Sequence, residues 1–290
     1  MKGDFMEFVR KGAIAPILTL FSVLFLAGCG GANHPAPSTS YVTSAIYAFM
    51  KAVQDESGNV TTTVQLRDGL DPVAARYLYL AGGETLYTSL DISPRQYLSF
   101  TGNLFDNSLG VSQHLKVMGA RDLYTDYFLF NQIVLGKPEY HSLNTPTAGS
   151  SPVRAYVDFE RTGNVLAGET SIELPAAFQI LAPASGASVT RATPVALTWS
   201  NVDATATMRL DVAVICDDGL RNTLNRDLGA DTGATTLNSA DYLPAGVSAS
   251  ATCQVAFILQ RLHSGLVSPN FAFGIIEGVQ RRTVQFTTIP

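Results

Sequence analysis

The chain has 290 residues, of which 46% are hydrophobic and 15% are charged, and its formal net charge is −5. This composition excludes a disordered chain, and the length allows one large core or two ordinary ones. No run of Lys and Arg occurs in the sequence. We therefore expect no nucleic acid partner and no electrostatic attraction to anionic lipid.

The amino-terminal segment has the layout of an export signal. Lys2, Arg10 and Lys11 precede an uncharged apolar run, residues 13–28, and a polar segment rich in proline and serine follows it. The run is shorter than the roughly 20 residues of a membrane-spanning helix, and Pro16 interrupts it. A cleaved secretory signal is therefore predicted rather than a membrane span.

The junction Leu26-Ala27-Gly28-Cys29 resembles the lipobox of bacterial lipoproteins. The resemblance implies that residues 1–28 are a lipoprotein signal peptide, that Cys29 becomes lipidated and that residues 29–42 form a lipidated, flexible tether. Because Gly30 rather than Asp follows the cysteine, it also implies an outer-membrane lipoprotein facing the periplasm or the cell surface. The mature chain keeps 16 basic and 22 acidic residues, a net charge of −6, so the lipid is expected to provide the membrane attachment alone.

After the tether, short apolar or alternating runs are separated by glycine-containing turns every eight to twelve residues or so, which is typical of an all-β sandwich or barrel. In residues 153–160, Val153, Ala155, Val157 and Phe159 alternate with polar partners, as in a half-buried strand. Whether residues 112–120 form a helix or a strand stays open.

Two domains are predicted because ten of the 11 tyrosines fall within residues 41–156. The expected domains are residues 43–175, rich in tyrosine, and residues 176–290, both antiparallel β-sandwiches. From Pro175 onward a proline-glycine segment leads into residues 195–199, where Val195, Leu197 and Trp199 share one face. This stretch resembles bacterial immunoglobulin-like and fibronectin type III-like modules, but Trp199 precedes both later cysteines, unlike the tryptophan of antibody domains.

Cys216 and Cys253 are the two cysteines that remain besides Cys29. Each lies on the apolar face of an alternating run, so both sulfur atoms are expected to point into the same core. A disulfide is predicted for an exported chain, and two buried free thiols are the alternative. No spacing of Cys and His suits zinc, and no metal or other cofactor is expected.

Sequence motifs of catalysis are absent: there is no nucleophile elbow, zinc-protease motif, phosphate loop or dinucleotide motif. His34, His114, His141 and His263 show no regular spacing and are interpreted as surface or loop residues. The aspartates in turns are expected to be solvated hairpin tips rather than calcium ligands; these are Asp217, Asp218, Asp227 and Asp231. Asp158 and Glu160 share a strand face with Arg154, which favours a mixed-charge surface over a catalytic carboxylate pair.

Tyrosines supply the one candidate binding surface. In residues 77–80, Tyr77 and Tyr79 alternate with two leucines, and Tyr47 with Phe49 repeats the arrangement, which would allow one sheet to present aromatic rings outward. Exposed rings stack on sugars or peptide groups. The alternative is that this face packs on a second sheet or the neighbouring domain.

Two functions follow as expectations. The first is a non-catalytic binding or assembly module, anchored to the membrane through Cys29, with an envelope protein or glycan as its partner. The second is a periplasmic hydrolase or glycan-processing enzyme whose site matches no known motif. A deep cleft with converging carboxylates would favour the second function.

Overall fold

The computed structural model describes residues 35–71, 74–90, 96–97, 99–100, 139–146 and 152–290. Regular structure in this part is almost entirely β, which confirms the predicted all-β fold. Residues 1–34, with Cys29 and the predicted signal peptide, lie outside the described residues, as do His114 and the undecided segment 112–120. In the described part, no helix is long and apolar enough to cross a bilayer.

The elements are short and follow one another closely along the chain. The first half contains β1 (Ala36–Pro37), the 3₁₀ turns η1 (Ser38–Ser40) and η2 (Thr43–Ala45), β2 (Tyr47–Gln54), β3 (Val60–Arg67), β4 (Tyr77–Tyr79), β5 (Thr85–Leu90), β6 (Gln96–Tyr97), β7 (Ser99–Phe100), β8 (Tyr140–Asn144), β9 (Arg154–Glu160) and β10 (Ala167–Glu173). The second half contains β11 (Ile180–Ala182), β12 (Ser188–Thr190), β13 (Val195–Trp199), β14 (Thr207–Cys216), β15 (Arg221–Ala230), β16 (Ala234–Leu237), α4 (Ser239–Tyr242), β17 (Cys253–Ser264) and β18 (Phe273–Ile289).

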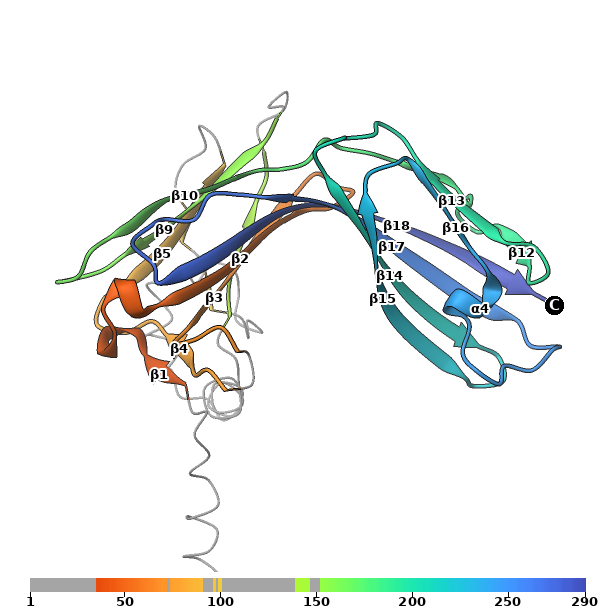
Figure 1. Cartoon of the computed structure of the whole chain (residues 1–290), viewed down its shortest axis with the longest axis horizontal. Helices are drawn as coiled ribbons and strands as arrows, with labels where there is room; N and C mark the ends of the chain where they lie inside the picture. Colours follow the sequence, from red (N-terminus) through yellow and green to blue (C-terminus); the bar gives the residue numbers. More distant parts are fainter. Residues whose placement is uncertain (1–34, 72–73, 91–95, 98, 101–138, 147–151) are drawn as a thin grey trace, which may run out of the picture.

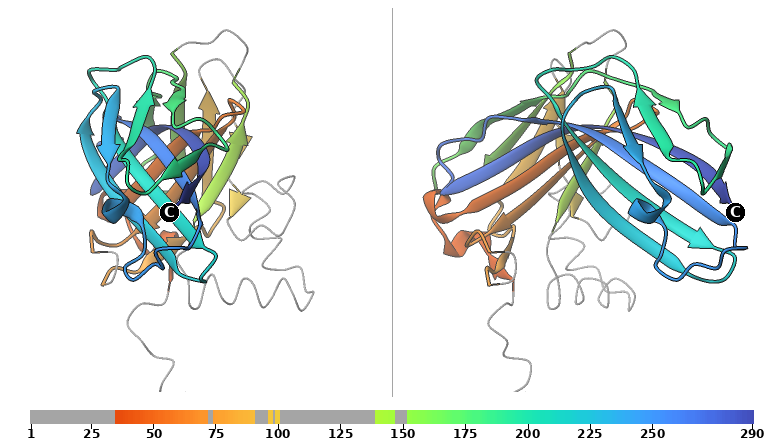
Figure 2. Two further views of the ribbon diagram at one scale, coloured as in Figure 1. Left: turned by 90° about the vertical axis from the view of Figure 1, so that its right-hand side faces the viewer. Right: turned by 45° about the vertical axis from the view of Figure 1, so that its right-hand side comes forward.

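The strands form three sheets. The main sheet has 11 strands and runs in the order β1-β4-β3-β2-β18-β17-β14-β15, with β8, β7 and β12 joined at its sides. The sheet β10-β9-β5-β6 lies over the first half and the sheet β11-β13-β16 over the second. In Figure 1 the main sheet is an arch, with one small sheet on the upper side of each arm, and Figure 2 shows the same layers from two other directions.

β18 joins the two halves of the arch. Its residues 273–280 pair in parallel with β2, and residues 277–288 pair antiparallel with β17. At about 3.3 Å per residue, this 17-residue strand is about 56 Å long. The main sheet is therefore mixed rather than purely antiparallel, and it continues from one arm into the other.

Two hydrophobic cores lie on either side of this join. The first is built from β2, β3, β5, β9 and β10, and the second from β13, β14, β17 and the end of β18. Phe271 and Ile276 belong to the first core, although the boundary predicted at Pro175 assigns them to the second domain. The difference arises because β18 returns to pair with β2, a long-range contact that no local pattern announces.

Gly278 lies where β10 packs on β18. A Cβ atom built on Gly278 would lie 2.6 Å from Ile172 Cγ1 and 3.2 Å from the Glu173 carbonyl oxygen. Such distances leave no room for a side chain. Glycine at this position therefore allows the two sheets to approach closely at the start of the join.

Part of the segment predicted as the tether, residues 29–42, belongs to the described fold. Ser38 and Thr43 are buried, and Ala36 and Pro37 pair with β4. Residues 36–42 therefore belong to the fold, because their hydroxyl and carbonyl groups are bound by the buried side chains described below.

The predicted strand faces and the predicted cysteine bridge are confirmed. Val195, Leu197 and Trp199 are buried in the second core, as are the apolar residues that alternate along β14 and β17. Cys216 and Cys253 are register partners on these two strands and form a disulfide. The phase of each run was sufficient to place both sulfur atoms in one core.

Candidate functional site

The face of the main sheet turned away from the small sheets carries the candidate site. On β2, Ala48, Met50 and Ala52 point into the first core, so Tyr47, Phe49 and Lys51 lie on the opposite face, where they are half-exposed. We call this side of the main sheet the outer face; it is the lower side of the arch in Figure 1. The same alternation places Phe273, Ile275 and Glu277 of β18 on it.

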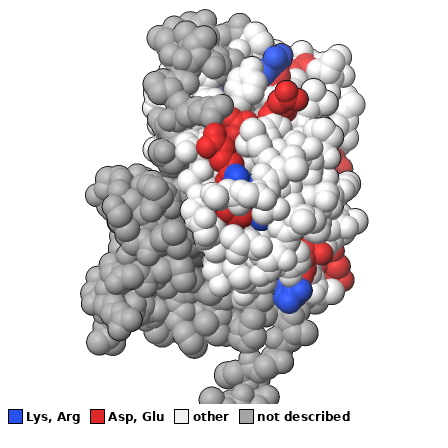
Figure 3. All heavy atoms as spheres, turned by 90° about the vertical axis from the view of Figure 1, so that its left-hand side faces the viewer, with Lys and Arg blue, Asp and Glu red and all other residues white. Residues whose placement is uncertain are grey.

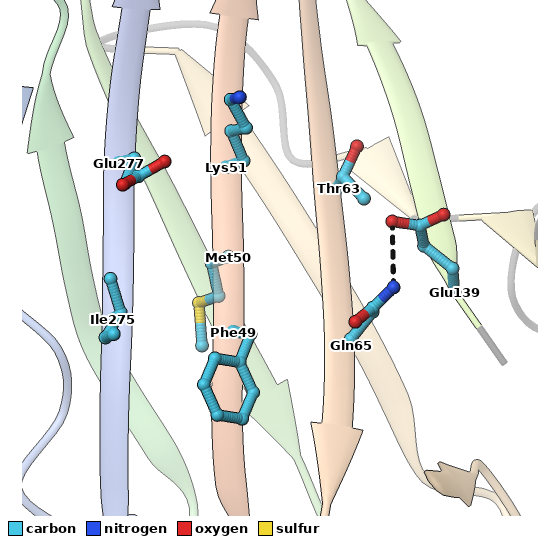
Figure 4. A pocket seen from close by; sticks show the side chains of 8 residues that line it. All are labelled: Phe49, Met50, Lys51, Thr63, Gln65, Glu139, Ile275 and Glu277. Carbon is cyan, nitrogen blue, oxygen red and sulfur yellow. Dashed lines mark hydrogen bonds between the residues drawn. The ribbon is translucent and has the colours of Figure 1, made fainter. Parts of the chain in front are cut away.

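A groove of about 350 Å³ crosses the outer face over β18, β2, β3 and the start of β8. Register pairs Ile275 with Phe49, and Phe49 with Gln65, so the lining side chains lie side by side. Figure 4 shows the Phe49 ring and Ile275 at one end of the groove and Lys51 with Glu277 at the other. Along the side of the groove next to β8, Gln65 Nε2 donates a hydrogen bond to Glu139 Oε1 at 3.2 Å.

Arg67 covers part of the aromatic surface that the tyrosine pattern predicts. Its guanidinium carbon lies 4.2 Å from the ring centroid of Phe49 and 4.8 Å from that of Tyr77. Tyr77 is buried, with 4% of its surface exposed, so the expectation that it presents its ring outward is not met. Arg67, its register partner on the neighbouring strand β3, lies over the ring in a cation–π contact.

Tyr47 and Tyr79, the other two tyrosines of the predicted binding surface, lie on different strands of the main sheet. Tyr47 is half-exposed on the outer face, and its ring centroid lies 6.3 Å from that of Phe273. Tyr79 is half-exposed on β4, opposite Pro37 of β1. Of the three predicted binding residues, only Tyr47 stands beside the groove, next to the exposed Phe273 and Ile275 that sequence patterns did not single out.

Polar side chains continue the outer face from the groove into the second half. Lys51 Nζ donates to Gln260 Oε1 at 3.3 Å, and Gln260 Nε2 in turn donates to Asp211. Burial lowers the pKa of Lys51, an effect that Glu277 opposes and Arg209 reinforces. The groove therefore opens onto a charged, hydrogen-bonded strip over the join of the two arms.

The histidines in the described part lie on strands, not on loops. His141 of β8 is 3.1 Å from Thr63 Oγ1 through Nδ1. His263 of β17 has its Nε2 3.1 Å from a carboxylate oxygen of Asp203 and 3.1 Å from Thr205 Oγ1. Burial by itself would raise the pKa of Asp203, but hydrogen bonds from Thr205 outweigh it and lower that pKa. Both histidines thus hold neighbouring segments together.

The turn aspartates do not converge on one point. Asp218 accepts from the Ser248 amide at 2.9 Å and Asp217 from the Thr252 amide at 3.0 Å, so both tie the turn after β14 to a neighbouring loop. Asp227 accepts from the Gly229 amide. Asp231 is buried with 5% exposure, which corrects its interpretation as a solvated tip. Among the described residues, no group of His, Cys, Asp or Glu is arranged to hold a metal.

Asp231 is paired with Arg261 in the interior of the second half. One Arg261 Nη lies 2.7 Å from Asp231 Oδ2, and both side chains are fully buried. Asp231 also accepts from Trp199 Nε1 at 2.6 Å, while Arg261 donates to the carbonyl oxygen of Ala176 at 2.7 Å. The pair therefore fixes the chain where it enters the second half.

Arg161 and Glu84 form a matching pair in the first half. Arg161 Nε donates to Glu84 Oε1 at 2.6 Å, and the second Nη donates to the carbonyl oxygens of Ser38 and Tyr41, both at 2.8 Å. The hydroxyl of Ser38 donates to Glu84. Sequence reasoning missed both arginines, although each continues an apolar face: Arg161 follows Val157 and Phe159, and Arg261 follows Phe257 and Leu259.

The β9 strand keeps its predicted mixed-charge side. Arg154 lies 2.9 Å from Glu173 of β10, and Asp158 and Glu160 follow it on the same half-exposed face while Val157 and Phe159 are buried.

No protein-family model matches the chain, and no curated protein matches it. The chemistry of its own surfaces is therefore the basis for a function.

Proposed function

We propose that this chain is a cell-envelope lipoprotein, attached to the outer membrane through an acylated Cys29, that binds glycan in the outer-face groove without transforming it. The observation that carries the binding proposal is the groove itself: a half-exposed aromatic ring flanked by amide, ammonium and carboxylate groups. Aromatic faces stack on sugar rings, and amides and carboxylates bind hydroxyl groups.

The structure of the outer face favours an extended ligand. Phe49 and Ile275 lie at one end of the groove, and the Lys51–Gln260–Asp211 strip continues from its other end over the second half. A polymer lying across the strands would contact apolar and polar groups in succession. Lys51 and Gln65 are both within the groove and are suited to hydrogen bonding with hydroxyl groups.

The anchor is tested by replacing Cys29 with serine in the full precursor. We expect the wild-type chain to incorporate labelled fatty acid and to sediment with outer membranes, and the C29S chain to remain unprocessed and unlabelled. Continued lipid labelling of the C29S chain would contradict the anchor.

The glycan site is tested with the purified full-length lipoprotein and insoluble cell-wall glycan. F49A is expected to weaken retention about tenfold, since an aromatic stacking contact contributes roughly 1.4 kcal/mol. The matched control is L181A, because Leu181 is 61% exposed on β11 of a small sheet and lies outside both the groove and the outer face. Equal retention of both variants would contradict the glycan proposal. If F49A instead loses a co-purifying envelope protein, the partner is protein rather than glycan.

A further inference from the structure

The end of the first half carries an exposed aliphatic cluster that the proposed glycan site does not use. Three loops meet there, residues 42–44, 163–166 and 269–270, which we call the loop tip. Val42, Val165 and Leu166 are 58%, 63% and 48% exposed. Single exposed aliphatic residues are ordinary, but a cluster at one end of a molecule marks an interaction surface.

The loop tip is held in place by specific hydrogen bonds. Thr43 Oγ1 donates to the Val165 carbonyl oxygen at 2.6 Å, and Asn270 Nδ2 donates to the Leu166 carbonyl oxygen at 2.7 Å. Arg161, directly before the turn of residues 162–166, donates to Thr43 Oγ1 at 3.1 Å and belongs to the buried pair with Glu84. The aliphatic side chains are therefore exposed on a fixed scaffold.

Charge is sparse at this end of the molecule. A hollow between the three loops is lined by eight residues, none of which is charged. Its polar groups are hydroxyls and amides, such as those of Ser44 and Asn164. Figure 3 views the molecule from this end and shows acidic and basic side chains confined to a few patches of a largely uncharged face. Such a surface suits the boundary between headgroups and acyl chains, and its binding should depend little on salt.

The length of the amino-terminal segment brings this end close to a membrane. The inference rests here on the proposed acylation of Cys29. Six residues lie between Cys29 and Ala36, the first residue of β1, and the seven Cα-to-Cα steps of a fully extended chain between them span at most about 25 Å. Val42 follows six residues later, in the segment that Arg161 holds against the first half.

We propose that the loop tip is a second membrane contact, in which Val42, Val165 and Leu166 enter the interfacial region of the lipid surface to which Cys29 is attached. One lipid anchor alone would not determine the orientation of the body on the membrane. A second, rigid contact fixes which end of the arch faces the bilayer and leaves the groove of the outer face beside the membrane rather than against it.

The test uses tryptophan quenching in the full-length acylated protein, reconstituted into vesicles of phosphatidylcholine with brominated acyl chains. The native Trp199 is the sole tryptophan and is 4% exposed in the second core, so it serves as an unquenched reference. In V165W the added emission is expected to shift to shorter wavelength and to lose more than half its intensity. The matched control is I215W, at an exposed position of the second half, which is expected to lose none.

Each outcome decides between the two proposals. If V165W is acylated and vesicle-bound but not quenched, the loop-tip contact is wrong while the anchor stands. If V165W and I215W are quenched equally, the body lies on the bilayer without a defined tip and the proposal is also wrong. If mass spectrometry finds Cys29 without lipid, the anchor fails, and the loop-tip proposal fails with it because the length argument no longer applies.

Discussion

The two halves of the arch hold their entering segments by the same device but differ in one covalent link. Each holds the segment by which the chain enters it through a fully buried arginine–carboxylate pair, Arg161–Glu84 in the first half and Arg261–Asp231 in the second. The second half adds the disulfide between Cys216 and Cys253, whereas in the described part of the first half the entering segment is held by the ion pair and its hydrogen bonds. A buried pair fixes one arrangement of the chain more than it adds stability, because desolvation offsets the attraction between the charges.

Breaking the buried pairs should have the largest effect. We expect D231N and E84Q each to lower the free energy of unfolding by about 3–5 kcal/mol, because each leaves an arginine buried without its charge partner. Chemical denaturation followed by circular dichroism measures this loss. E84Q should also expose residues 38–43 to protease below the global transition, while D231N should not. Equal protection of that segment in both variants would contradict its dependence on Arg161.

Removing the disulfide is expected to lower the free energy of unfolding by a similar amount, with the effect confined to the second half. The two cysteines are separated by 37 positions, and the chain-entropy model assigns about 4 kcal/mol to a loop of that length. The double variant C216S/C253S is compared with the wild-type chain in urea, with and without reductant. If reductant destabilises the double variant as much as the wild type, the effect does not come from this bridge.

Substituting Gly278 tests the join between the halves. G278V is expected to cost about 1–3 kcal/mol, since its side chain would overlap Ile172 and the β10 backbone. The matched control is G58A: Gly58 also lacks a Cβ but has open space around it, so its cost should come only from its positive φ of 84°. In hydrogen exchange, G278V is expected to lose amide protection most strongly in β10 and β18. An equal loss of protection over both halves would contradict a local role of Gly278 at the join.

His141 should give the smallest effect, a weak pH dependence of the first half. Burial lowers its pKa below 6.5, and Glu139 opposes this shift. Between the pKa of His141 in the unfolded chain and its lower pKa in the folded chain, the unfolded chain binds more protons. The stability that His141 contributes is therefore present above about pH 6.5 and is lost as the pH falls through the pKa of the folded state. When the pH falls from 7.5 to 5, the free energy of unfolding of H141Q should decrease less than that of the wild type, by a difference of less than about 1 kcal/mol. Parallel denaturation curves of both proteins at pH 7.5 and pH 5 measure it.

Local sequence patterns predicted the structure correctly where the burial of a residue depends only on which face of its own strand it occupies. The alternation along β9, β13, β14 and β17 predicted which residues are buried, and together with the count of cysteines it predicted the bridge between Cys216 and Cys253. These inferences succeed because a period of two fixes the face of every residue in a strand.

Features that depend on long-range pairing were not accessible from the sequence. Nothing in the pattern of residues 273–280 shows that they pair with β2 rather than stay within the second half, so the sequence did not show that Phe271 and Ile276 pack in the first core. Tyr77 alternates correctly with Leu78, but alternation does not show that Arg67 from the neighbouring strand lies over its ring. The groove itself combines residues from three strands with Glu139, the residue before β8.

The parallel pairing of β2 and β18 also determines how the molecule carries tension. A pull between the segment before β2 and the carboxyl end of β18 would draw β2 from its first residue and β18 from its last, in opposite directions along neighbouring parallel strands. Eight register pairs, Phe273–Tyr47 to Gln280–Gln54, would then be loaded in shear, so their hydrogen bonds would share the load together instead of opening one after another. The strand that joins the two halves is thus placed to make the two arms one stiff unit under such a load.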